Sequence, residues 1–144
     1  MRRQSVSAAV AARAWQAAIA ACHARARTAD QTDWARIVTL YEALARLSPS
    51  PVIELNRAVA VSMAFGPAAG LAVADALTSE PALAEYHLLP SVRGDLLTKL
   101  GRFAEARAEL ERAAGLARNA RERDLLLARA AACAQETGAR GSNR

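Results

Sequence analysis

The sequence predicts an all-α protein built as a tetratricopeptide-like array of helical hairpins, an α-solenoid with about three degenerate repeats. Alanine supplies 38 of the 144 residues, against 7 Gly and 5 Pro, which favours helix over strand throughout. Apolar residues recur at the three- and four-residue spacing of a buried helix face. Gly66 and Gly101 each separate two such stretches and lie 35 residues apart, close to the tetratricopeptide period of about 34 residues.

Turn signals define the helices expected in the first half. Asp30 or Thr32 caps a helix whose buried face holds Trp34, Ile37, Val38, Tyr41, Leu44 and Ala45. The Ser-Pro-Ser-Pro run at 48–51 ends this helix and begins the next one. That next helix, ending before Gly66, is apolar on nearly every side, so we expect it to be buried from two directions.

The second half is predicted in the same way. A short Ala-rich helix at 67–78 precedes a segment that runs to Leu100, in which Pro90 either kinks one helix or separates two pieces. After Gly101, a helix places on one stripe Phe103, Ala106, Leu110, Ala113 and Ala117. A last helix, near 119–136, is expected to direct inward Leu125, Leu126 and Leu127.

We therefore expect a helical repeat domain at 15–136, preceded by an atypical segment at 1–14 and followed by a disordered tail at 137–144. Cys22 and Cys133 are flanked by Ala, which is typical of small buried side chains in a reducing compartment. The opening residues make a poor secretory signal, although an acid-free, Arg-bearing start is also typical of organellar transit peptides. The sequence thus predicts a cytoplasmic protein. A severed module would leave Trp15, Ile19 and Cys22 without cover, and we expect self-association through that face.

The net charge of +5 comes from one segment. Five arginines and no acid lie in the first 29 residues, and the rest of the chain is balanced. A nucleic-acid-binding domain usually concentrates basic residues on one face and interleaves them with aromatic residues. We therefore expect only weak DNA contacts without sequence preference.

No catalytic, metal or cofactor site is predicted, so the chain is not expected to be an enzyme. No nucleophile and base stand at a useful spacing, and the Gly66–Gly70 stretch lacks the Lys-Ser/Thr of a phosphate loop. Cys22 and His23 point about 100° apart on a helix and cannot share a metal. His87 beside Tyr86 is interpreted as a packed pair.

Asn56, Arg57 and Arg93 are the candidate partner-binding residues. Asn56 and Arg57 interrupt an apolar helix in which Leu55, Val59, Val61 and Phe65 are expected to be interior. Either they line the concave groove of the array, or both are buried and satisfied by backbone groups and an acid such as Asp95, in which case a buried Arg pair would fix the stacking register. Arg93, in the first helix of the following repeat, would line the same groove.

Several segments resemble the C-terminal part of bacterial extracytoplasmic-function RNA polymerase sigma factors, in the group that carries a tetratricopeptide-like extension. The resemblance covers roughly Trp15 to Cys133, and LNRAVAV and the YHLL segment are its more specific parts. The similar segments are QAAIAACHARA (16–26), DWARIVTLYEAL (33–44), PSPVIELNRAVAV (49–61), GPAAGL (66–71), YHLLPSVRGDLLTKLGR (86–102) and NARER (119–123).

The resemblance implies a transcription-regulatory interaction domain whose partners are protein: sigma-factor core regions, RNA polymerase or a regulator. The residues before Trp15 are too few for the promoter-reading regions of such factors, so we interpret the chain as a detached extension, to which direct promoter binding does not carry over. The alternative is a free-standing helical-repeat scaffold that binds a peptide or a protein partner.

Overall fold

The computed structural model describes residues 2–25 and 32–143, with the side chains of residues 10–24 and 32–143. These residues form seven α-helices and a short 3-10 turn and contain no β-strand, which confirms the all-α class. The chain divides into two compact parts, the N-terminal unit (Met1–Val73) and the C-terminal unit (Ala74–Arg144), where the sequence predicts one domain.

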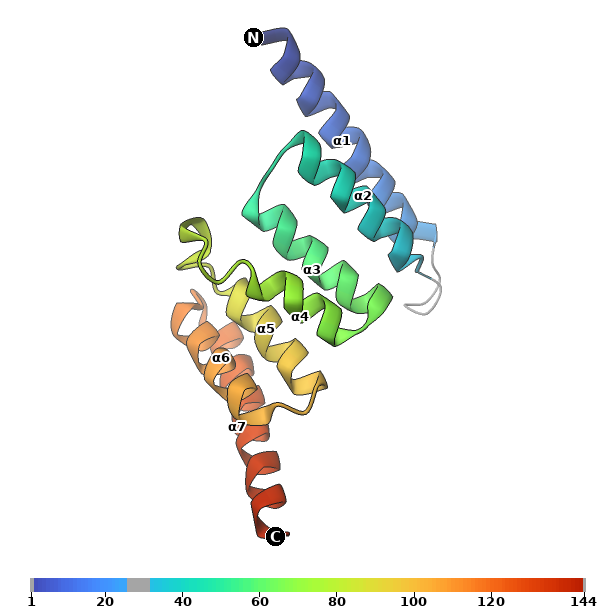
Figure 1. The fold of residues 1–144 in the computed structure, drawn as a ribbon. Coiled ribbons are helices and arrows are strands. Elements are labelled where there is room, and N and C mark those ends of the chain that lie inside the picture. Colours follow the sequence, from blue (N-terminus) through green and yellow to red (C-terminus); the bar gives the residue numbers. More distant parts are fainter. Residues whose placement is uncertain (1, 26–31, 144) are drawn as a thin grey trace. The chain divides into compact units, whose positions relative to one another are not determined.

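The N-terminal unit holds α1 (Arg2–Arg25), α2 (Trp34–Leu47), α3 (Pro51–Phe65) and most of α4 (Pro67–Asp75) (Figure 1). Helix α1 runs without a break from Arg2 to Arg25 and so crosses the expected boundary after residue 14. Asp33 caps α2 by accepting a hydrogen bond from the Arg36 N–H at 3.1 Å, in place of the expected Thr32; Asp30, the other expected cap, lies outside the described residues.

The core of the N-terminal unit lies between α1, α2 and α3. Its fully buried residues include Ile37 and Leu44, as the spacing on α2 predicts. Ile19 and Cys22 are buried against this core and Trp15 packs beside it, so the expectation that this face stands uncovered is wrong. The expectation for α3 is also wrong in part, because Val52, Val59, Met63 and Phe65 are exposed and only one side of the helix, around Leu55, Ala58 and Val61, is buried.

The C-terminal unit is formed by a 3-10 turn (Pro81–Leu83), α5 (Leu88–Lys99), α6 (Phe103–Leu116) and α7 (Ala120–Ser142) (Figure 1). Pro90 sits in the first turn of α5, where the backbone N–H has no partner within the helix, and therefore begins one helix without interrupting it. Gly101 has a φ of 75° and Gly66 a φ of 102°, so both glycines occupy the left-handed region at helix ends, as their positions predict.

The start of α7 agrees with the prediction, whereas its end does not. Asn119 caps the helix by accepting a hydrogen bond from the Glu122 N–H at 2.7 Å, close to the expected start. The helix then continues to Ser142, through the Thr137-Gly138 end and most of the tail expected to be disordered; Arg144 lies outside the described residues. Only Leu126 of the three leucines faces the core, since Leu125 is 61% and Leu127 45% exposed.

Candidate functional site

The three predicted site residues lie in different settings. Asn56 is exposed on α3, and Arg57 follows it on the same helix in the N-terminal unit. Arg93 lies on α5, in the C-terminal unit. Each unit is therefore described by its own contacts.

Arg57 is paired within its own helix. Its guanidinium donates to both Glu54 carboxylate oxygens, with Nη2 to Oε2 at 2.9 Å, and the two side chains are 23% and 31% exposed. Among the side chains that the structure describes, no charged one is fully buried, so the interpretation of Arg57 as a buried register residue is wrong. Asp95, the acid suggested for it, instead binds Lys99 at 3.0 Å and Arg129 at 2.8 Å.

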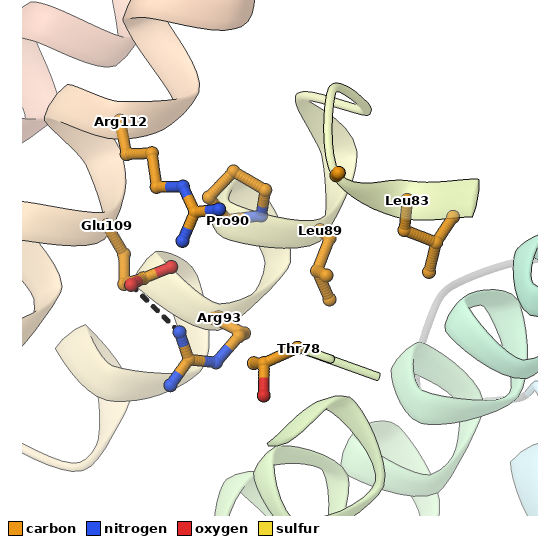
Figure 2. A pocket seen from close by; sticks show the side chains of 8 residues that line it. Thr78, Leu83, Leu89, Pro90, Arg93, Glu109 and Arg112 are labelled. Carbon is orange, nitrogen blue, oxygen red and sulfur yellow. Dashed lines mark ion pairs between the residues drawn. The ribbon is translucent and has the colours of Figure 1, made fainter. Parts of the chain in front are cut away.

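Arg93 is held between two carboxylates of the C-terminal unit, of which Figure 2 shows Glu109. It contacts Asp75 at 3.0 Å and Glu109 at 2.8 Å, and the Arg93 and Glu109 side chains are only 20% and 17% exposed. The hollow beside it, lined also by Leu89, Pro90 and Arg112, has a volume of about 10 Å³. Such a space holds about one water and has no room for a ligand. The guanidinium thus links Asp75 to Glu109 on α6 within the C-terminal unit.

Arg93→Ala is expected to lower the free energy of unfolding by about 1–2 kcal/mol, because Glu109 would lose its partner in a half-buried position. Arg57→Ala removes a single pair within one helix and should cost less than about 0.5 kcal/mol. Urea unfolding followed by circular dichroism measures both. Equal losses of unfolding free energy in the two variants would contradict the prediction that the Arg93 ion pairs stabilise the fold more than the Arg57 ion pair does.

Asn56 lines a hollow of about 290 Å³ in the N-terminal unit, which the sequence analysis did not identify. Four residues of α1 contribute to it at helical spacing, two come from α2, and Ile53 precedes Asn56 on α3. The lining comprises Gln16, Ile19, Ala20, His23, Tyr41, Leu44, Ile53 and Asn56. The repeat of Gln16, Ile19, Ala20 and His23 at i, i+3, i+4 and i+7 marks one helix face, and this was the available signal.

Tyr41 and His23 are the two aromatic side chains in the lining of this hollow, and both carry polar atoms. Partial burial removes Tyr41 from water and raises the pKa of its phenol above the ordinary value, so the hydroxyl stays neutral. The His23 ring meets the Trp34 ring edge to face, with centroids 5.2 Å apart. Cys22, next to His23, points into the core, in keeping with the angle between successive helix residues.

A second hollow, of about 440 Å³, lies between α7 and the α5–α6 turn. Phe103 and Cys133 contribute to it, with Arg129 and Glu136 also in its lining. The Arg140 guanidinium covers the Phe103 ring at 4.9 Å. The adjacent Arg102 guanidinium donates hydrogen bonds to Glu105, and these bonds lower the pKa of the Glu105 carboxyl.

His87 gains a partner that the sequence did not indicate. Its Nε2 lies 2.7 Å from Glu122 Oε1 on α7, and its ring meets Tyr86 edge to face at 5.9 Å.

The described residues contain no group of three or more His, Cys, Asp and Glu side chains placed to hold a metal ion. None of the described helices combines the length and the apolar character needed to cross a membrane.

No protein-family model matches the chain, and no solved structure matches it. An uncharacterized protein of Rhizobium meliloti (strain 1021) is 54% identical to it over 107 residues. The match covers 74% of this chain and 25% of that relative. The chain therefore spans about a quarter of the length of the curated relative that it matches.

Proposed function

We propose that this chain is a protein-interaction domain made of helical repeats, and that it serves as the C-terminal extension of an extracytoplasmic-function sigma factor. In this role it would modulate transcription initiation by contacting sigma regions, RNA polymerase or a regulator. No catalytic step or cofactor belongs to the proposal.

The packing of α5 against α6 supports the helical-repeat part of this proposal. A Cβ atom placed on Gly94 would lie 2.7 Å from two side-chain atoms of Leu110, so the small residue allows the two helices to approach closely. Ala106 and Ala113 are fully buried. These are the positions at which the tetratricopeptide pattern requires small residues, and Gly101 turns the chain between the two helices.

The sigma-factor part is supported by the resemblance of LNRAVAV and the YHLL segment and by the length of the Rhizobium relative. Three quarters of that relative lie outside the match. This length leaves room for promoter-reading regions in a longer protein of the same kind. The resemblance implies that such regions and this domain act together.

The observation that carries the interaction role is the hollow around Asn56, whose apolar floor is bordered by side chains that donate and accept hydrogen bonds. Binding sites commonly combine a mostly apolar lining with a few convergent polar groups. Asn56 is thus the predicted groove residue that lines a sizeable hollow, whereas Arg57 and Arg93 are engaged by carboxylates.

The test is a binding experiment with purified components. The part of the Rhizobium relative outside the match is expected to form a complex with this chain on size-exclusion chromatography at micromolar concentrations, alone or together with core RNA polymerase. Asn56→Ala should weaken the complex, and Gln135→Ala, which removes an amide from the other hollow, should not. Absence of any complex with either partner would overturn the sigma-factor role.

The second candidate is a free-standing scaffold that binds a peptide or a protein partner outside transcription. The hollow around Asn56 favours this candidate as well, because its lining could bind a peptide or protein segment that does not belong to a sigma factor. A gene directly upstream that encodes promoter-reading regions would support the first candidate over this one.

A further inference from the structure

The hollow around Asn56 differs from the hollows at Arg93 and Cys133 in the charge of its lining. Asp, Glu, Lys and Arg make up 23% of the chain, yet none of them lines it. By contrast, the hollow at Arg93 includes Glu109 and Arg112, and the one at Cys133 includes Arg129 and Glu136. A charged group entering the Asn56 hollow would lose hydration without meeting an Asp, Glu, Lys or Arg side chain in the lining, which is unfavourable.

The polar groups at its border have the chemistry of the peptide bond. Gln16 and Asn56 each carry an amide that donates through its nitrogen and accepts through its oxygen. A peptide group offers the matching acceptor and donor, so one side-chain amide can satisfy it at both ends. Gln16 lies on α1 and Asn56 on α3, so the two residues line the hollow from different helices.

The floor between the amides is apolar. Ile19 is 6% and Leu44 1% exposed, and Ile53 and Ala20 complete the surface. The volume of about 290 Å³ is near the lower limit of ordinary ligand sites, which begin at about 300 Å³. This size suits one side chain and its flanking peptide groups better than a large ligand.

We propose that this hollow binds one apolar side chain of an extended, uncharged peptide segment, with the Gln16 and Asn56 amides hydrogen-bonded to the peptide groups on either side. The proposal rests on the interaction role given above and names the ligand class of that same hollow. Tyr41 and His23 would supply further hydrogen bonds at the border, while the floor excludes water from the apolar side chain.

The probe is N-acetyl-leucine N-methylamide, which carries one apolar side chain between two peptide groups. Proton–nitrogen correlation NMR of the nitrogen-labelled full chain should show saturable shifts of the Gln16 and Asn56 side-chain amide signals, with a dissociation constant on the order of 1 mM. The Gln135 amide signal provides an internal reference in the same spectra.

Four matched probes separate the contributions of the side chain, its charge and the peptide groups. The capped glycine analogue lacks the side chain and should not saturate, and the capped lysine and aspartate analogues should bind at least about tenfold more weakly. Isopentanol carries the apolar group without peptide bonds. Equal binding of isopentanol and capped leucine would overturn the role of the amides, and equal binding of a charged analogue would overturn the preference for uncharged segments.

Asn56→Ala is expected to weaken capped leucine about threefold to tenfold, the effect of losing one or two hydrogen bonds, and Gln135→Ala to leave it unchanged. Asn56 is exposed, so we expect its truncation to leave the fold intact. Circular dichroism checks that the variant is folded. Unchanged affinity in a folded Asn56→Ala chain would overturn the proposal. A complex with the Rhizobium polypeptide would still stand in that case, so the two proposals fail separately.

Discussion

Leu110→Ala is expected to destabilise the C-terminal unit by about 3–5 kcal/mol. Leu110 on α6 is 0% exposed and fills the space that Gly94 leaves on α5. Truncation to Ala removes apolar contacts and leaves a cavity, which the backbones of α5 and α6 can close only in part. Close packing through Gly94 thus makes this position more sensitive than an average core leucine.

Urea unfolding followed by far-ultraviolet circular dichroism measures the effect. Leu125→Ala is the matched control, because this leucine on α7 is 61% exposed and its loss should change the free energy of unfolding by less than about 0.5 kcal/mol. Similar small losses in both variants would show that α5 and α6 do not pack through Gly94 and Leu110.

Gly70→Ala is expected to destabilise the N-terminal unit by about 1–3 kcal/mol. An added Cβ would lie 2.4 Å from the Cβ of Ser62 and 2.8 Å from the carbonyl oxygen of Ala58, both on α3. The oxygen belongs to the backbone, so a rotamer change cannot relieve the overlap and α4 must move away. The gain in helix propensity from Gly to Ala, at most about 1 kcal/mol, offsets only part of this cost.

Tryptophan fluorescence reports this variant, since Trp15 and Trp34 both lie in the N-terminal unit. Gly115→Ala on α6 is the control and is followed by circular dichroism, because it lies in the C-terminal unit: nothing lies within 4 Å of its added Cβ, and the substitution should stabilise that unit by about 0.4–1 kcal/mol. If Gly70→Ala were also stabilising, the close approach of α3 and α4 would be disproved.

Most of the helices could be predicted from residues that act locally. Pro51 at the start of α3 and the two glycines with positive φ act through their own backbone preferences, which follow from the residue type alone. The end of α7 could not be predicted in this way. Gly138 in the Thr137-Gly138 signal continues the helix, because Gly lowers helix propensity without preventing helical dihedrals.

Burial was harder to predict than helix formation. Three consecutive leucines lie about 100° apart around α7, so Leu126 can reach the core only if Leu125 and Leu127 turn away from it. Val59 and Met63 on α3 are exposed because an apolar sequence does not state how many neighbouring helices cover it. In both cases the segment is apolar as predicted, but its composition does not say in which direction each side chain points.

One part of the candidate site could be predicted from local sequence, and the other part could not. Asn56 could be predicted because a polar residue in an apolar helix requires a reason, but Gln16 and Tyr41 are ordinary residues in their own helices. Their place beside Asn56 depends on the packing of α1, α2 and α3, which no local pattern encodes. The suggested pairing of Arg57 with Asp95 was wrong, because Glu54, three residues earlier on the same helix, pairs with Arg57.

Each unit contains one free, buried thiol, Cys22 in the first and Cys133 in the second. Both thiols are nearly inaccessible to solvent in the closed structure, so the rate at which a bulky thiol reagent reacts with them rises with the opening of the surrounding helices. The wild-type chain therefore carries two separate chemical reporters of local unfolding. Mass spectrometry of the peptides around the two cysteines would give the opening free energies of both units in a single experiment, without any added label.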